Sequence, residues 1–198
     1  MDTRQRILAA AERVMRTSGY ARATTKAIAQ AAGLSEGSLY NYFPTKEALF
    51  LAVLREQLPG FIAFVTALPG RAGTGTVRDN LAEIARVALA FYVESVPVGL
   101  SVSTDPDLLA RLRDAVRQRQ IGPQRANELV ADYLRAEQRL GRVCSDADPD
   151  AAADLLVGAC FQRAYLLHFL AEELPPAAVA RFVAGIVDVL MGGLAPAP

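Results

Sequence analysis

Hydroxyl, amide and lysine side chains are concentrated in residues 23–46, where the sequence predicts two short helices joined by a tight turn. Gly33 supplies the turn, and Ser35 is placed to cap the helix that follows it. Pro44 ends that second helix, because the residue before a proline is driven out of the helical conformation. Such a layout can hold a small helix in the major groove of DNA while its flanks contact the phosphates.

The second of these helices carries the side chains suited to reading bases. Ser38, Tyr40 and Asn41 are its outward polar residues. Leu39 and Phe43 are expected to point into the core instead. Asparagine can pair with the edge of adenine, and serine can donate to or accept from most bases. The segment therefore predicts a helix-turn-helix that binds double-stranded DNA.

The distribution of charge favours the same segment, although the formal net charge of the whole chain is zero. Residues 1–58 carry eight Lys or Arg against five Asp or Glu, and residues 59–198 carry thirteen against sixteen. The amino-terminal part is thus mildly basic, as a region that contacts phosphates should be. It also contains both lysines of the chain, Lys26 and Lys46.

Composition and the placement of reactive residues argue against several classes of protein. No apolar run reaches the roughly 18 residues that span a bilayer, and no secretory signal follows the amino terminus, so we expect a cytoplasmic protein with no membrane partner. Cys144, Cys160 and the single histidine lack the spacing of a metal site, and we expect neither a metal nor a cofactor. Residues 33–37 match the pattern G-x-S-x-G, but a hydrolase elbow needs a preceding strand and a histidine partner. An enzyme is therefore not expected.

The elements that hold the DNA-binding segment are predicted to be helices throughout. No stretch shows the period-two alternation of a strand, so the expected fold class is all-α, with about nine helices. Capping residues, glycines and prolines give their boundaries. The predicted helices cover 3–18, 24–32, 36–43, 45 onward to a break or kink at Pro59–Gly60, 77–95, 105–120, 122–141, 148–173 and 176–191.

The last two predicted helices are unusually apolar for the end of a chain. An isolated monomer would leave part of this surface in water, and pairing with a second copy is the natural way to cover it. The residues expected at such a dimer interface are Leu155, Ala159, Leu166, Phe182, Ile186 and Val189.

Aromatic residues in the same part of the chain are candidates for lining a ligand cavity. Phe161, Tyr165 and His168 share one face of their helix. That face is either a cavity wall with a polar group or simple packing in the core or dimer interface, and both interpretations stay open. The further candidates are Phe64, Phe91, Tyr92 and Tyr133.

Residues 1 to about 56 closely resemble the DNA-binding region of the tetracycline-repressor (TetR/AcrR) family of bacterial regulators. Several spaced residue types agree, which makes the resemblance more specific than one short motif. The matching residues are Thr24-Thr25, Ile28-Ala29, Ala32-Gly33-Leu34-Ser35, Gly37-Ser38-Leu39-Tyr40, Tyr42-Phe43 and Lys46-Glu47-Ala48-Leu49. The rest of the chain resembles the family only in length and helix order.

The resemblance implies a homodimer built on the last two helices and a ligand cavity in each subunit. It divides the chain into a helix-turn-helix DNA-binding domain at 1–56 and an effector-binding and dimerisation domain at 57–198. It places the recognition helix at Glu36 to Tyr42 and Lys26 near a base or phosphate. The full set of expected DNA contacts is Thr24, Thr25, Lys26, Ser35, Glu36, Gly37, Ser38, Tyr40, Asn41, Tyr42 and Lys46.

Glu36 is a departure within this set. Its carboxylate would repel phosphate and is useful mainly if it accepts a hydrogen bond from the amino group of cytosine. Taken together, we expect a homodimeric regulator that binds a roughly palindromic operator, a repressor released by a small lipophilic or aromatic ligand. The alternative is a helical adaptor that has kept the DNA-binding head, residues 1–56, but does not bind DNA specifically. The zero net charge leaves this alternative open.

Overall fold

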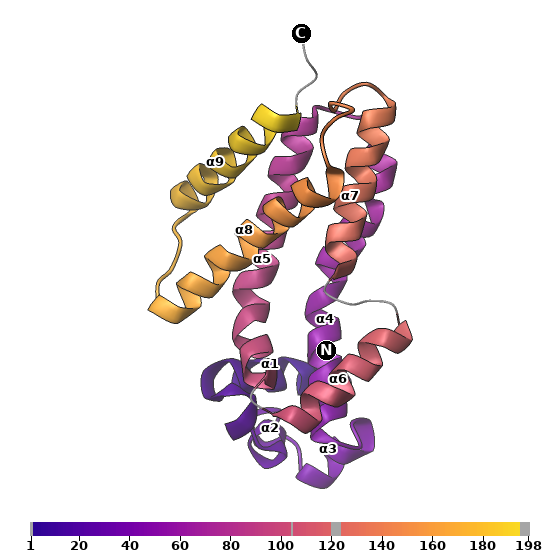
Figure 1. Cartoon of the computed structure of the whole chain (residues 1–198). Coiled ribbons are helices and arrows are strands. Elements are labelled where there is room, and N and C mark those ends of the chain that lie inside the picture. Colours follow the sequence, from indigo (N-terminus) through magenta and orange to yellow (C-terminus); the bar gives the residue numbers. More distant parts are fainter. Residues whose placement is uncertain (1, 104, 120–123, 195–198) are drawn as a thin grey trace. The chain divides into compact units, whose positions relative to one another are not determined.

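The computed structural model describes residues 2–103, 105–119 and 124–194. Within those ranges every regular element is helical, and no strand is present, which confirms the all-α fold class (Figure 1). The elements are α1 (Thr3–Arg22), α2 (Thr25–Ala31), α3 (Glu36–Tyr42), α4 (Lys46–Ala67), the short 3₁₀ helix η1 (Leu68–Arg71), α5 (Val77–Ser103), α6 (Pro106–Arg119), α7 (Gln124–Arg139), α8 (Pro149–Leu170) and α9 (Pro176–Leu194).

Packing divides the chain into two compact units. The amino-terminal unit combines Met1–Pro59 with Glu94–Arg119, and the carboxy-terminal unit combines Gly60–Val93 with Gln120–Pro198. The long helices α4 and α5 therefore each contribute to both units. This division describes packing alone, and the functional division into 1–56 and 57–198 stays a prediction.

The core of the amino-terminal unit is built from the apolar stripe of α1 and the inward faces of the next three helices. Ile7, Leu39 and Phe50 have no exposed surface at all. Burying side chains of this size stabilises a fold by roughly 1.5–3 kcal/mol each. Val102 of α5 belongs to the same cluster, with Leu109 of α6 partly buried against it. The small helices of the head are thus held by tertiary packing rather than by their own length.

Two helices continue past the residues at which the sequence pattern predicts that they end. The expected break or kink at Pro59–Gly60 was wrong as a helix end, because α4 runs on to Ala67. Likewise α5 continues through Pro97 to Ser103 rather than stopping near Ser95. A proline inside a helix removes one hydrogen bond and costs roughly 3 kcal/mol. Val96 and Val102, on either side of Pro97, are 4% and 1% exposed. Burying two side chains of this size is worth a free energy comparable to that cost.

The ends of two other helices also differ from the prediction. Gly19 has φ 73° and ψ 158° and interrupts α1, but helix resumes beyond it as far as Arg22. Helix α8 ends at Leu170, because Ala171 adopts a left-handed conformation with φ 54°. The predicted start at Gly122–Pro123 lies outside the described residues.

The carboxy-terminal unit packs α7 against α8, with α9 following α8 through a short connection (Figure 1). Its interior contains a polar cluster as well as apolar residues. The Asn80 amide donates to the Tyr133 hydroxyl at 3.0 Å and to the carbonyl oxygen of Thr74 at 2.9 Å. Glu137 is fully buried, and its carboxylate accepts from the backbone N–H of Gly73 and lies 3.3 Å from the guanidinium of Arg142. This cluster fixes the loop before α5 onto α7.

Helix α9 corrects one expectation drawn from composition. With 19 residues and a mean hydropathy of 1.8, it is long and apolar enough to cross a membrane by length and composition alone. The sequence reading missed this because Arg181 and Asp188 interrupt its apolar run. In this structure Val183, Val187 and Leu194 are buried, and Asp188 forms an ion pair with Arg78 of α5. The helix also continues past the predicted end at Gly192–Gly193 to Leu194, whose carbonyl oxygen accepts from the backbone N–H of Cys144 at 2.8 Å.

Candidate functional site

The turn between α2 and α3 is fixed by backbone geometry and by one arginine. Gly33 has φ 67°, a conformation that side chains other than glycine rarely adopt. The backbone N–H of Leu34 donates to the carbonyl oxygen of Ala29 at 2.9 Å, which closes the turn. Arg6 of α1 donates from Nη2 to the carbonyl oxygen of Ala32 at 2.8 Å. The two short helices are therefore held at a set angle by contacts within the unit.

Hydroxyl side chains cap the starts of α2, α3 and α4, as the sequence predicts. Thr24 accepts from the backbone N–H of Ala27 at 3.1 Å, and Ser35 accepts from that of Ser38 at 3.1 Å. Thr45 caps α4 through the N–H of Ala48 at 3.0 Å. Each such cap contributes roughly 1 kcal/mol. The role of Ser35 in this structure is therefore to cap α3 and to contact the hydroxyl of Ser38, at 2.8 Å.

Helix α3 has one buried edge and one exposed polar face, and its bounds match the predicted recognition helix, Glu36 to Tyr42. Leu39 and Phe43 are 0% and 4% exposed, which confirms their inward orientation. Of the expected outward polar residues, Tyr40 and Asn41 are exposed and Ser38 is half-buried. Glu36, Gly37 and Tyr42, which complete the expected DNA contacts of this helix, are exposed as well. A Cβ atom added at Gly37 would meet no atom within 4 Å, so packing inside the unit does not require glycine there.

The first turns of α2 and α4 supply the remaining candidates. Thr24 and Lys26 are exposed and Thr25 is half-buried at the start of α2. Lys46 is half-buried at the first position of α4. These flanking positions carry both lysines of the chain, which suits contact with phosphate oxygens.

A contact that the sequence did not reveal links α2 to α3. The Thr25 hydroxyl donates to the Glu36 carboxylate at 2.5 Å and lies 3.3 Å from the Tyr40 hydroxyl. Eleven residues separate Thr25 from Glu36 along the chain. No sequence signal marks such a pair, because it depends on the angle between the two helices.

The candidate ligand residues fall into separate groups in the carboxy-terminal unit. Phe91 stacks on Phe61 with ring centroids 4.6 Å apart, and Tyr92 contacts both Phe91 and Phe161, at 5.2 and 5.4 Å. Burial, together with the nearby Cys160 thiol, raises the pKa of Tyr92 to about 12, so its hydroxyl stays protonated at neutral pH. Phe61 was missed by sequence reasoning, because it directly follows the residues interpreted as a break.

Four other ligand candidates lie outside this aromatic cluster of Phe61, Phe91, Tyr92 and Phe161. Tyr133 belongs to the polar cluster, where burial and then the neighbouring Glu137 carboxylate raise its pKa. Phe64 packs under the guanidinium of Arg71, 5.3 Å from its ring centre. Tyr165 stacks on Phe169 at 6.1 Å, and His168 is exposed in the last turn of α8.

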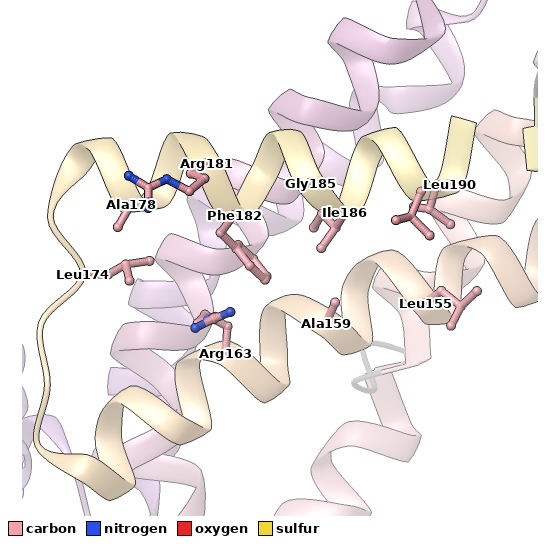
Figure 2. Close-up of a pocket in the computed structure, with 11 residues that line it drawn as sticks. Leu155, Ala159, Arg163, Leu174, Ala178, Arg181, Phe182, Gly185, Ile186 and Leu190 are labelled. Carbon is pink, nitrogen blue, oxygen red and sulfur yellow. The ribbon is translucent and has the colours of Figure 1, made fainter. Parts of the chain in front are cut away.

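Helices α8 and α9 enclose an open groove of about 660 Å³. Figure 2 shows Phe182 and Ile186 directed from α9 toward α8. Arg163 reaches up from α8, with its guanidinium carbon 4.8 Å from the centre of the Phe182 ring (Figure 2). Five of the six residues expected at a dimer interface line this groove: Leu155, Ala159, Phe182, Ile186 and Val189. The sixth, Leu166, is exposed on α8.

Polar residues elsewhere give no sign of a metal centre: the described part of the chain holds no group of three or more His, Cys, Asp or Glu side chains that could bind a metal ion. Cys144 and Cys160 are both free thiols. The Cys160 thiol is buried and donates to the carbonyl oxygen of Ala85 at 3.4 Å.

Two segments of the chain match known families of bacterial regulators. Residues 7–53 match the model of the bacterial regulatory proteins of the tetR family, and residues 109–193 match that of the C-terminal domain of AefR-like transcriptional repressors. The chain is 28% identical over 171 residues to the HTH-type transcriptional repressor Rv1474c of Mycobacterium tuberculosis, covering 77% of this chain and 88% of that protein. It is 27% identical over 196 residues to the HTH-type transcriptional regulator UidR of Escherichia coli, covering 97% and 92% of the two chains.

The fold is also similar to that of solved structures. A Mesorhizobium loti protein assigned to the TetR-family transcriptional regulators superposes with a TM-score of 0.77 at 20% identity, over 98% of this chain and 96% of that one. Both ends of the chain match the family, and the exposed polar face of α3 lies inside the first matching segment. The chain therefore belongs to the TetR family of bacterial regulators, and it is a DNA-binding transcription regulator rather than an enzyme.

Proposed function

We propose that the protein is a homodimeric repressor that binds a roughly palindromic operator through α3 and leaves it when a small lipophilic or aromatic ligand binds. The observation that carries the DNA-binding part is the exposed polar face of α3, held by the Ser35 cap and the Gly33 turn. In this assignment Ser38 and Asn41 contact base edges, while Thr24, Thr25, Lys26, Tyr40, Tyr42 and Lys46 contact phosphates or neighbouring bases.

The second copy is proposed to cover the groove between α8 and α9. Leu155 is 65% exposed and Val189 is 79% exposed, although both are large apolar side chains. Leaving such a surface in water is unfavourable, and a twofold partner presents the same surface in return. The dimer would set the distance between two α3 helices, which must match about 34–36 Å or a multiple of that spacing on the duplex.

The ligand is proposed to act on the carboxy-terminal domain, residues 57–198, by favouring a conformer whose heads no longer match the operator. A ligand shifts such a balance only by its differential affinity for the two states. The aromatic cluster of Phe61, Phe91, Tyr92 and Phe161 supports a lipophilic or aromatic compound as the effector, with the protonated Tyr92 hydroxyl as a polar contact. As a DNA regulator, the protein is proposed to act in the cytoplasm.

The test of this function is selection of bound duplexes from a random pool, followed by fluorescence anisotropy on the selected motif. A regulator of this kind should yield a motif with twofold symmetry and bind it at least about 1,000-fold more tightly than random duplex. Equal binding of selected and random DNA at physiological salt would instead favour a protein-interaction adaptor. Lipophilic and aromatic compounds are then screened for release of the labelled duplex.

A further inference from the structure

Three side chains on the proposed DNA-facing surface are hydrogen-bonded to one another. The Thr25 hydroxyl donates to the Glu36 carboxylate at 2.5 Å and lies 3.3 Å from the Tyr40 hydroxyl. Thr25 has a single hydroxyl hydrogen, and a carboxylate can only accept. Because that hydrogen goes to Glu36, Tyr40 must be the donor in its contact with Thr25. The Tyr40 hydroxyl thus donates to the Thr25 hydroxyl, which in turn donates to the Glu36 carboxylate.

This arrangement opposes contact with the DNA backbone in two ways. Phosphate oxygens are acceptors and need donors, but the donors of Thr25 and Tyr40 are already used within the protein. The Glu36 carboxylate also repels phosphates across the surface on which Lys26 and Lys46 attract them. An acidic residue here therefore weakens sequence-independent binding.

Cytosine can change that balance. In the major groove its N4 amino group is a donor, and Glu is a side chain suited to accept from it. Glu36 is exposed, and the adjacent Gly37 has open space where a Cβ would lie, so the carboxylate has room to turn outward. Once it does, the hydroxyl hydrogens of Thr25 and Tyr40 become available to phosphate oxygens.

We propose that Glu36 is a specificity-determining residue that holds the Thr25 and Tyr40 hydroxyls away from phosphates until its carboxylate accepts from a cytosine amino group. The proposal rests on the DNA-reading role of α3 proposed above. It makes two contributions depend on one base: the direct hydrogen bond to cytosine, and the phosphate contacts that this bond releases. Any other base leaves the three side chains bonded to one another.

The test uses the full chain and the variants Glu36→Ala and Glu36→Gln. Binding of a labelled random-sequence duplex is measured by anisotropy, and each protein is used to select duplexes from a random pool. Glu36→Ala should bind the random duplex about fivefold more tightly, the effect of removing one repulsion between unit charges a few ångströms apart in water. Its selected motif should lose a cytosine that the wild type requires at one fixed position of each half-site.

Glu36→Gln keeps the proposal testable if the alanine variant misfolds, because glutamine has nearly the same shape as glutamate. It should exchange the preference at the same position from cytosine to adenine, the base with which glutamine pairs. The matched control is Glu12→Ala, which removes the same charge from α1 of the same unit. It should leave the motif unchanged, since Glu12 is not hydrogen-bonded to Thr25, Glu36 or Tyr40 in the proposed arrangement.

The outcomes separate the two proposals. If the wild type selects a motif and both Glu36 variants select the same motif, α3 reads DNA but Glu36 has no part in specificity. Unchanged or weaker binding of random duplex by Glu36→Ala would overturn the proposed restraint on phosphate contacts. If the wild type selects no motif at all, the proposed function and this inference both fail.

Discussion

Arg6 of α1 donates from Nη2 to the carbonyl oxygen of Ala32 at 2.8 Å, which ties the first helix to the end of α2 at the turn. This bond crosses 26 residues of sequence and lies in a partly buried environment. It satisfies a carbonyl at the end of a helix, where no backbone partner is available. The orientation of α3 on the surface therefore depends on a residue that lies outside the helix-turn-helix segment.

Replacing Arg6 with Ala should destabilise the head by roughly 1.5–3 kcal/mol, the usual contribution of a hydrogen bond to a charged donor. Chemical denaturation of the full chain measures this loss. Arg16→Ala, at an exposed position of the same helix, serves as the control and should change stability by no more than about 0.5 kcal/mol. Equal stability of the two variants would show that the Arg6 bond does not hold the turn.

Lys46→Ala should weaken binding to every duplex by a similar factor, because a phosphate contact carries no sequence information. The plot of log affinity against log salt should become shallower by about one unit. Anisotropy titrations across a series of salt concentrations give that slope. Arg86→Ala, an exposed change in the carboxy-terminal unit, should leave it as in the wild type. A slope unaltered by Lys46→Ala would remove this residue from the phosphate contacts.

Asn41→Ala should change which sequences are bound rather than how strongly DNA in general is bound. Loss of a good base contact discriminates against the former base by about 1–3 kcal/mol at one position. Selection from a random pool should therefore show relaxed preference at one position of each half-site. A uniform loss of affinity on all duplexes would place Asn41 among the backbone contacts instead.

Ile186→Asp should produce a monomer, because it places a charge in the apolar groove proposed to be covered by a second copy. Sedimentation equilibrium should give a mass near 21.2 kDa instead of twice that value. The matched control is Ala184→Asp on the same helix, which is exposed and does not line the groove. It should remain dimeric. A dimeric Ile186→Asp protein would mean that the subunits meet through another surface.

Stability should fall as the solution becomes alkaline, partly because of Cys160. Burial raises the pKa of this thiol from 9.0 to about 12. Between those values the unfolded chain has released a proton that the folded chain still holds, so the free energy of unfolding decreases as pH rises. The contribution of one such group approaches about 1.4 kcal/mol per pH unit. Below about pH 9 this contribution is constant, since both states keep the proton.

Cys160→Ala should make the alkaline decline shallower by part of that amount, as measured by denaturant unfolding at several pH values from about 8 to 11. Comparing slopes rather than absolute stabilities removes the cost of the small cavity left by the sulfur atom. Identical slopes for the variant and the wild type would mean that another group controls the decline.

The helix starts and the turn of the head could be predicted from its own residues. Hydroxyl residues at 24, 35 and 45 are followed by helices, and Gly33 adopts the left-handed conformation for which glycine is suited. The bounds of α3 follow from Ser35 at one end and Pro44 at the other. Capping and turn signals act over three or four residues, so a sequence shows them directly.

The continuous helices at Pro59 and Pro97 show where local signals fail. Each proline predicts an end or a kink, but helix persists through both. A helix end depends on whether packing offsets the lost hydrogen bond. Val102, beyond Pro97, is buried in the cluster that includes Ile7 and Leu39, which are distant in the sequence. The stacking of Phe61 on Phe91 was hidden for the same reason, since it joins α4 to α5.

The amino-acid sequence by itself determined the all-α class, the position of α3 and the polar residues on its outer face, because these follow from periodicity, caps and turns within short windows. Only the tertiary structure decided that Thr25 bonds to Glu36, that Arg6 holds the turn, and that α8 and α9 enclose a groove. These relationships join side chains on different helices. Their distances depend on how the helices pack, which no single stretch of sequence encodes.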